Sequence, residues 1–258
     1  MPKTDQLIRY FPPLFTILAG LLIWWLITTL ELVNPLFLPR PSAVGKSFIN
    51  LLSETSIYID VFVTLSRAIV GLMLSAIVGI PLGLIFGRYP QIYDFFELPV
   101  DFFRSIPSSA LFFLFILLFG IGNASKVAVV FYGCSLILLV AAYYGAKPSR
   151  EKQDRINMLK SFGANSWQIL YLSVFRDAVP NILTGFRVCV SLSLVLVIVT
   201  EMFLGANDGL GRRIYDFYLA YRLPEMYTVL IILGLVGFVS NRISLLVERR
   251  VAFWLPAE

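Results

Sequence analysis

The chain alternates long apolar stretches with shorter polar connections. A helix needs about 20 mostly apolar residues to cross the hydrocarbon core of a bilayer. Six stretches approach or meet that length, at about residues 11–30, 68–86, 105–122, 127–146, 182–204 and 227–246. The pattern therefore predicts an all-α integral membrane protein with six transmembrane helices, organised as a single domain over residues 1–258. Gly79, Pro81 and Gly83 interrupt the second stretch, but neighbouring helices satisfy the backbone groups that such residues free in a membrane.

Composition supports a membrane-embedded chain and removes several classes of function. The chain is 58% hydrophobic and 14% charged, whereas about 25% of the residues of a soluble protein are charged. Its net charge of +5 comes without a basic run interleaved with aromatics, which argues against nucleic acid as a partner. The sequence has no histidine, so the most frequent metal ligand and general base is missing and an integral-membrane enzyme is disfavoured. Cys134 and Cys189 lie in apolar stretches and are expected to be reduced core residues.

The distribution of lysine and arginine predicts the orientation. Cytoplasmic segments of membrane proteins carry an excess of these residues. With the N-terminus inside, the inner segments hold about twice as many of them as the outer segments. Both termini are therefore expected in the cytoplasm, with the chain crossing the cell inner membrane several times. The first outer segment begins with prolines, after which residues 42–52 predict a short interfacial helix.

The connection between the fourth and fifth predicted spans, residues 147–180, is long and patterned. Apolar residues recur every three positions over residues 151–162 and predict an amphipathic helix. Gly163 follows where a left-handed helix cap is expected, and Asn165 or Ser166 can cap a second helix that ends before the fifth span. The resulting apolar stripe lies on the water side of the membrane. The stripe either packs beneath the helix bundle or docks a soluble partner. The two interpretations are compatible, because one half of the stripe can pack while the other half docks.

Short motifs recur at specific spacings along nearly the whole chain. Ser-Phe-Gly-Ala-Asn-Ser-Trp-Gln begins at residue 161, and Pro-Asn-Ile-Leu-Thr-Gly-Phe-Arg begins at residue 180. Three further motifs are Arg-Ser-Ile-Pro-Ser at 104–108 with Phe-Gly-Ile-Gly at 119–122, Glu-Met at 201–202 with Gly-Leu-Gly at 209–211, and Leu-Pro-Arg-Pro-Ser at 38–42. Together they resemble the nitrate, sulfonate and taurine type of ATP-binding-cassette importer permease. That family's cytoplasmic pattern is Glu-Ala-Ala, three residues, Gly, and later Pro-x-Ile-x-x-Gly. Here Asn157, Met158 and Leu159 replace Glu-Ala-Ala, which removes a carboxylate, while Gly163 is kept.

The resemblance implies a type I importer permease-like fold and a division of labour among subunits. Two permease copies pair as a homodimer, each docks one cytoplasmic ATP-binding-cassette ATPase subunit, and an extracytoplasmic binding protein delivers the substrate. The sequence has no Gly-x-x-x-x-Gly-Lys-Ser/Thr phosphate loop, so the chain is expected to be non-catalytic and to bind no cofactor, with ATP and Mg on the ATPase. The residues predicted to couple to the ATPase are Leu159, Phe162, Gly163, Ala164, Trp167 and Leu170.

Polar side chains within the spans are the candidates for the translocation path, because placing them in lipid is costly. Packing between helices is the alternative explanation for the serines. The predicted path residues are Ser105, Ser108, Ser109, Ser191, Ser193, Thr200 and Glu201. Glu201 is expected near the outer face, where it pairs with Arg212 or Arg213 or forms part of an outer gate. Arg187, nearer the inner face, either favours an anion or extends to the interface.

The outer segment at residues 205–224 is basic on the side of the membrane where positive charge is sparse. Its Arg212, Arg213 and Arg222 are predicted to contact the binding protein. The family that the chain resembles carries nitrate, bicarbonate, sulfonates, taurine and some vitamin precursors, so the expected substrate is a small polar, anionic solute. A stand-alone secondary transporter or channel is the alternative. It would need an inverted repeat and an acidic residue near the middle of a span, and the sequence shows neither.

Overall fold

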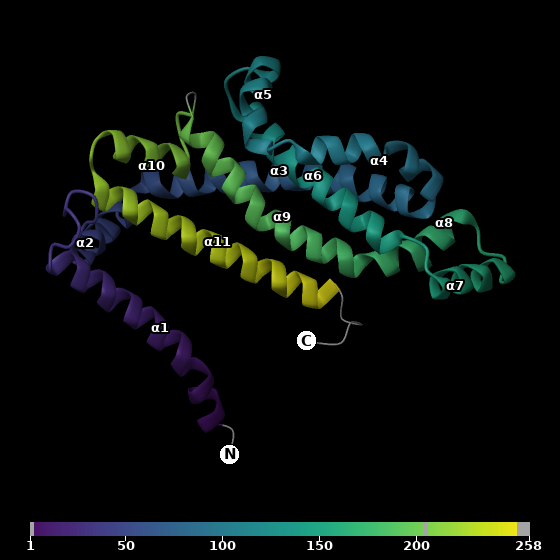
Figure 1. The fold of residues 1–258 in the computed structure, drawn as a ribbon, viewed down its shortest axis with the longest axis horizontal. Helices are drawn as coiled ribbons and strands as arrows, with labels where there is room; N and C mark the ends of the chain where they lie inside the picture. The colour runs from purple at the N-terminus through teal and green to yellow at the C-terminus, as the bar shows by residue number, and fades with distance from the viewer. Residues whose placement is uncertain (1–2, 204–205, 252–258) are drawn as a thin grey trace. The chain divides into compact units, whose positions relative to one another are not determined.

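The computed structural model of the chain describes residues 3–203 and 206–251, with side chains from residue 15 onward. All regular elements of this part are helical (Figure 1). The α-helices are α1 (Lys3–Thr29), α2 (Pro41–Leu52), α3 (Thr55–Arg88), α4 (Pro90–Ser105), α5 (Phe112–Phe119), α6 (Asn123–Ala146), α7 (Arg150–Ser161), α8 (Ser166–Ile169), α9 (Arg176–Met202), α10 (Leu210–Leu219) and α11 (Leu223–Val251). A 3₁₀ turn, Ser108–Leu111, precedes α5, and a π-helical turn, Leu170–Phe175, joins α8 to α9.

Among the described residues, four continuous helices are long and apolar enough to cross a bilayer. They are α3, α6, the run Ser166–Met202 and α11. Four of the predicted spans fall in these helices, apart from Phe203, which follows the end of α9, and Leu204, which lies outside the described residues. The first predicted span coincides with α1. The part of α1 with described side chains, Phe15–Thr29, is an apolar helix shorter than a full span. The side chains of residues 11–14 are outside the described part.

The third predicted span, residues 105–122, is wrong as a continuous helix. α4 ends at Ser105, and the segment Ser108–Phe119 is bent by 81° relative to it. Pro107 disfavours helical backbone at the residue before it, and Ile106 is accordingly extended, with φ −81° and ψ 122°. Hydropathy alone hides this break, because apolar residues flank it on both sides.

The chain divides into two compact units, Met1–Tyr58 with Arg213–Leu233 and Ile59–Arg212 with Gly234–Glu258. In the smaller unit, the Trp24 and Tyr227 rings stack with centroids 6.4 Å apart. The Thr228 hydroxyl donates to the carbonyl oxygen of Val44, at 3.2 Å. Val44 lies in α2, which confirms the short helix predicted over residues 42–52.

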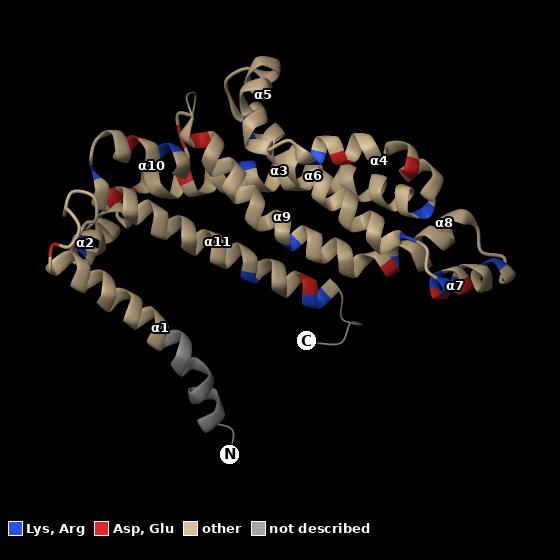
Figure 2. Ribbon diagram, in the orientation of Figure 1, with Lys and Arg blue, Asp and Glu red and all other residues tan. Residues whose placement is uncertain are grey.

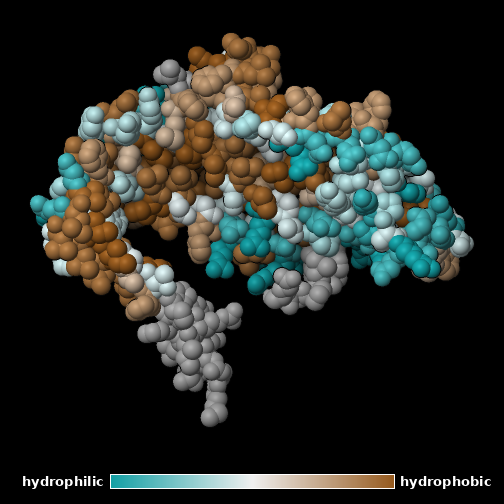
Figure 3. Space-filling model, in the orientation of Figure 1, coloured by the Kyte–Doolittle hydropathy of each residue, from teal (hydrophilic) through white to brown (hydrophobic). Residues whose placement is uncertain are grey.

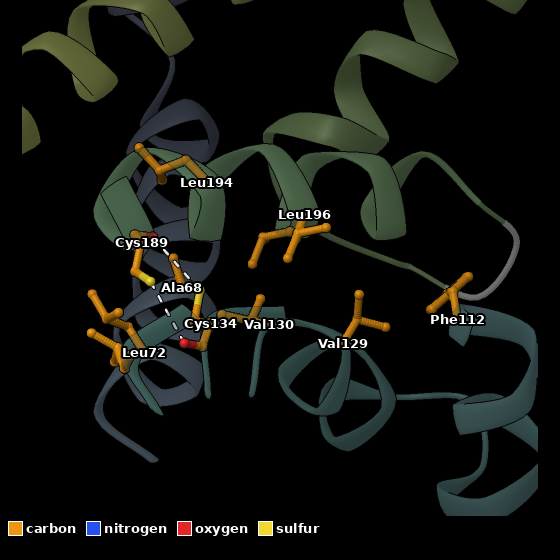
Figure 4. Packing of buried hydrophobic residues seen from close by; sticks show 11 residues of the cluster. Ala68, Leu72, Phe112, Val129, Val130, Cys134, Cys189, Leu194 and Leu196 are labelled. Atoms are coloured by element: carbon orange, nitrogen blue, oxygen red, sulfur yellow. Dashed lines mark hydrogen bonds between the residues drawn. The ribbon is translucent and has the colours of Figure 1, made fainter. Parts of the chain in front are cut away.

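In the larger unit, α6 packs along α9 (Figure 1). Their facing side chains form a buried core with residues of α3 and α5, which Figure 4 shows from close by. Cys134 and Cys189 meet in this core. Each thiol donates to the other residue's carbonyl oxygen, with sulfur–oxygen distances of 3.7 and 3.6 Å. Both cysteines are free and buried, which confirms the prediction made for them.

Glycines bring α3 and α6 into close contact. A β-carbon at Gly79 would lie 2.5 Å from the carbonyl oxygen of Ser135, and one at Gly83 would lie 2.2 Å from that of Leu139. Small residues allow helix backbones in a membrane to approach each other closely. The glycines that interrupt the second apolar stretch are therefore part of its packing surface.

Apolar side chains cover much of the molecular surface in the view of Figure 3. Phe62, Leu98 and Leu117 are 71%, 80% and 83% exposed. Figure 2 shows that α5 carries no charged residue, whereas charged residues gather on α7. Apolar helices with charged residues collected in a connecting segment are the arrangement that a bilayer and its aqueous boundary require.

Candidate functional site

A glycine turn joins α7 to the segment that follows it. The backbone N–H of Gly163 donates to the carbonyl oxygen of Lys160 (2.9 Å), and that of Ala164 donates to Leu159 (3.0 Å). Gly163 has φ +80°. These two bonds and the left-handed residue form a Schellman helix end, in which glycine avoids the penalty that a β-carbon would bring. The left-handed cap predicted at Gly163 is confirmed.

The next helix begins with a reciprocal cap. The side chain of Asn165 accepts from the backbone N–H of Gln168 (2.9 Å), and the Gln168 side chain accepts from the backbone N–H of Asn165 (2.8 Å). This capping box satisfies two N–H groups at the helix start. The prediction that this second helix stops before the fifth span is wrong, since it continues through the π-helical turn into α9. Pro180 lies inside α9, where the packed helices α6 and α9 favour a continuous helix over the loss of one backbone hydrogen bond.

The apolar stripe of this segment divides into a packed half and an exposed half. Ile156 and Ile169, each 5% exposed, belong to a core cluster with α6 and α9. Three of the predicted coupling residues pack against that cluster, namely Leu159, Ala164 and Leu170. Phe162 and Trp167, in contrast, are 81% and 79% exposed. The Gly163 turn lies between these two exposed aromatic residues.

The packed half is anchored by polar contacts as well. Arg155 of α7 forms an ion pair with Asp177 of α9, with an N–O distance of 2.5 Å. The Lys152 ammonium group donates to the carbonyl oxygen of Gly145 at the end of α6, at 2.7 Å. The turn that carries Phe162 and Trp167 is therefore attached to the same two helices that form the core of the larger unit.

A second candidate site is a buried ion-pair network at the end of α9. Glu201 is 0% exposed and pairs with Arg67 of α3, with an N–O distance of 2.6 Å. The carboxylate also accepts from the Thr64 hydroxyl (2.9 Å) and from the backbone N–H of Gly211 (3.0 Å). Sequence analysis expected Glu201 to pair with Arg212 or Arg213 or to form part of an outer gate, whereas the structure pairs it with Arg67 of α3.

The same network holds the chain that follows α9. Arg67 pairs with the Asp208 carboxylate and donates to the Asp208 carbonyl oxygen (3.1 Å) and to the Asn123 side chain (2.8 Å). Asp60 accepts from the backbone N–H of Gly209 at 2.7 Å. A β-carbon at Gly209, which has φ +106°, would lie 2.5 Å from the Glu201 carboxyl group. Residues 208–211 are therefore fitted closely against α3.

Sequence analysis missed the α3 half of this network. Asp60, Thr64 and Arg67 are separated by four and three residues, so they lie on one helical face, and all three are buried. That spacing is the signal that identifies them, but the predicted span began only at Ala68, whereas α3 begins at Thr55. Lys126 of α6 is also buried and donates to the carbonyl oxygen of Gly122 at 2.9 Å. Within the described part of the chain, no group of three or more acidic, cysteine or histidine side chains could hold a metal ion.

The predicted path residues lie in different surroundings. Ser105 is exposed at the end of α4, Ser108 and Ser109 are half-buried in the 3₁₀ turn, and Ser191 is exposed on α9. Ser193 and Thr200 are buried on α9. The hydroxyl of Ser193 donates to the carbonyl oxygen of Val190 (2.9 Å), and that of Thr200 donates to Val197 (2.8 Å).

The three arginines predicted to meet a binding protein are partly engaged within the chain. Arg213 is 19% exposed and lies 3.4 Å from the Glu54 carboxylate. Arg222 is 56% exposed and lies 2.8 Å from Glu225. Arg212 is half-buried at the start of α10. Glu201, the carboxylate considered for Arg212 or Arg213, pairs with Arg67, as does Asp208.

Comparison with known proteins matches residues 79–253 to the family described as binding-protein-dependent transport system inner membrane component. The taurine transport system permease protein TauC of Escherichia coli K12 is 25% identical over 93% of this chain and 88% of that protein. The nitrate import permease protein NrtB of Synechocystis is 28% identical over 84% of this chain and 77% of that protein. An inward-facing structure of the MetNI methionine ABC transporter superposes with a TM-score of 0.66 at 20% identity, covering 76% of this chain and 96% of that one.

Proposed function

Because the chain belongs to the family of binding-protein-dependent transport system inner membrane components, we propose that it forms the membrane path for a small polar anion. It is a permease subunit of an ATP-binding-cassette importer and a multi-pass protein of the inner membrane. Taurine and nitrate appear in the names of its relatives. The proposed substrate class is accordingly nitrate, bicarbonate, sulfonate or taurine.

Charge along α3, α6 and α9 is the observation that supports an anion. Asp60, Asp177 and Glu201 are the acidic side chains of α6, α9 and the part of α3 within the larger unit, and each accepts a hydrogen bond from another group of the chain. Arg187 of α9 is exposed. Carboxylates that are already hydrogen-bonded within the chain, together with an exposed guanidinium, favour an anion over a cation near these helices.

Coupling to the ATPase is assigned to the segment that carries the Gly163 turn. Phe162 and Trp167 are the proposed contacts, because large exposed aromatic side chains on a rigid turn are typical anchors of a protein interface. Leu159, Ala164 and Leu170 are proposed to support these anchors from the packed half of the segment. The subunit itself is proposed to be non-catalytic, with ATP and Mg bound by two separate ATPase subunits.

The translocation path is assigned to hydroxyl groups of the 3₁₀ turn and α9, repeated in a second copy of the chain. Ser105, Ser108, Ser109 and Ser191 are the members that a single subunit leaves exposed or half-buried. Ser193, Thr200 and Glu201 are buried within the subunit, so in this conformation they support the path from behind. Two copies facing each other would double the exposed hydroxyls around one axis, which suits a polar solute that is bound weakly and then released.

The extracytoplasmic binding protein is proposed to meet Arg212, Arg213 and Arg222. Complementary charge mainly raises the association rate, and salt screens it. Replacing Arg212 and Arg213 together by alanine is expected to raise the binding-protein concentration for half-maximal transport, with the largest effect at low ionic strength. An unchanged concentration at low ionic strength would refute this contact. Loss of assembled complex would instead indicate that the arginines serve folding.

Reconstituted transport tests the proposed function. The permease, its ATPase and its binding protein are placed in proteoliposomes, and uptake of labelled taurine, sulfonate, bicarbonate and nitrate is measured with and without ATP. We expect uptake of at least one of these solutes, each of which carries an anionic group, and this uptake should require both ATP and the binding protein. Uptake without ATP would favour the alternative of a stand-alone transporter or channel. ATP-dependent uptake of a cationic solute alone would overturn the substrate class but keep the importer.

A further inference from the structure

A cavity of about 320 Å³ lies at the predicted cytoplasmic end of α3. One wall comes from the last turn of α3 and the residue after it, and the other comes from α7, α8 and the π-helical turn. The residues that matter for its chemistry are Ile85, Arg88, Tyr89, Lys160, Trp167 and Leu170. All of them belong to the larger unit.

Two cations face this cavity without a neutralising anion. Arg88 and Lys160 line it, and none of the residues lining it is acidic. No carboxylate among the described residues pairs with either of them. The Arg88 guanidinium lies 5.4 Å from the centroid of the Tyr89 ring, a contact that leaves its N–H groups available to a ligand. The cavity therefore attracts an anion that can accept hydrogen bonds.

Apart from Ser166, the rest of the wall is apolar or aromatic, and the predicted second span places it at the boundary of the membrane. Ile85 is in the second predicted span, one residue from its end at Phe86. Tyr89 is 49% exposed. Tyrosine is enriched where hydrocarbon meets the headgroup region. A ligand in this cavity would touch cations, aromatic rings and aliphatic side chains.

We propose that this cavity binds the headgroup of an anionic phospholipid from the cytoplasmic leaflet. The phosphate group lies between Arg88 and Lys160, and the glycerol and first acyl carbons lie against Ile85 and Leu170. Basic pockets between helices on the cytoplasmic side are suited to such headgroups. The apolar wall and the level of the cavity favour a lipid over free phosphate, which would gain nothing from Ile85 or Leu170. The site would make the segment that carries Trp167 sensitive to membrane composition, independently of which solute is transported.

The test compares lipids on the purified importer complex of permease and ATPase. Native mass spectrometry measures retention of phosphatidylglycerol and phosphatidylcholine, and quenching of tryptophan fluorescence by brominated versions of both lipids reports proximity to Trp167. We expect preferential binding of phosphatidylglycerol. We also expect stronger quenching by brominated phosphatidylglycerol than by brominated phosphatidylcholine, and Trp167→Phe should remove this difference, whereas Trp24 and Trp25 of α1 are quenched by both lipids. Arg88→Gln with Lys160→Gln should weaken phosphatidylglycerol binding by about 30-fold, the effect of removing two cations at a membrane surface.

The matched control is Lys147→Gln with Arg150→Gln, which removes the same amount of charge from the connection that carries Lys160 but outside the cavity. This control should bind as the wild type does. Three results would overturn the proposal. They are equal binding by the cavity double variant and the wild type, equal quenching by the two brominated lipids, and displacement of the lipid by millimolar inorganic phosphate. Release of the ATPase by the double variant with unchanged lipid binding would assign the cavity to the ATPase interface instead. If the double variant does not assemble, the quenching measurements on the wild type and Trp167→Phe decide.

Discussion

Replacing Gly163 by valine perturbs the backbone of the proposed coupling segment without a steric clash. A β-carbon at this position would meet nothing within 4 Å, so the cost comes from the φ of +80°. A left-handed conformation costs an L-residue about 1–2 kcal/mol, and a β-branched residue is especially disfavoured there. This lowers the preference for the native turn by roughly 5- to 30-fold relative to other backbone conformations.

The displaced turn would move Phe162 and Trp167, which flank it, while the core between α6 and α9 stays intact. We therefore expect Gly163→Val to reach the membrane in normal amounts but to lose ATP hydrolysis stimulated by the binding protein severalfold. The assay is phosphate release by the reconstituted complex, together with the amount of ATPase that copurifies. Gly163→Asn is the matched control, because asparagine tolerates the left-handed region and should retain most of the stimulation.

Normal stimulated hydrolysis in Gly163→Val would refute the reasoning that the geometry of this turn couples the permease to ATP hydrolysis by the ATPase. Equal loss in the valine and asparagine variants would show that side-chain size at the surface matters, and not the backbone conformation. Loss of the protein from the membrane would show that the turn is required for folding.

Three further predictions concern the buried network and the path. Arg67→Met should destabilise the solubilised protein by about 3–5 kcal/mol, because it leaves the buried Glu201 carboxylate without its cation. Adding Glu201→Met removes that unpaired charge and should recover part of the lost stability. Additive losses of the two substitutions, measured by thermal unfolding, would contradict this. Gly209→Ala should lower the unfolding temperature, since its β-carbon would lie 2.5 Å from the Glu201 carboxyl group, and an unchanged temperature would show that the loop adjusts freely. With the native cysteines replaced, a cysteine at Ser191 should react with a water-soluble thiol reagent in a nucleotide-dependent way, whereas one at the buried Ser193 should react slowly; equal, nucleotide-independent labelling would place the path elsewhere.

Local features of the chain were readable because single residues impose them. The helix end at Gly163 and the cap at Asn165 depend on backbone and side-chain properties of a few consecutive residues, and both are found as predicted. Four spans were recognised because a membrane helix must be apolar over a length set by the bilayer. The permease family followed from motifs whose residues and spacing are likewise local.

Tertiary contacts decided the rest, and the two prolines show why. Pro107 accompanies a break of 81°, whereas Pro180 lies within a continuous helix, although each occurs beside apolar sequence. The same holds for the apolar stripe, since periodicity predicts one face but not that Ile156 is covered and Phe162 is exposed. Arg67 and Glu201 are separated by 134 residues, so no local pattern pairs them. Hydropathy determined which segments are helical and membrane-embedded, while the choice of partners depended on which helices pack together, because burial and ion pairing are properties of neighbours in space.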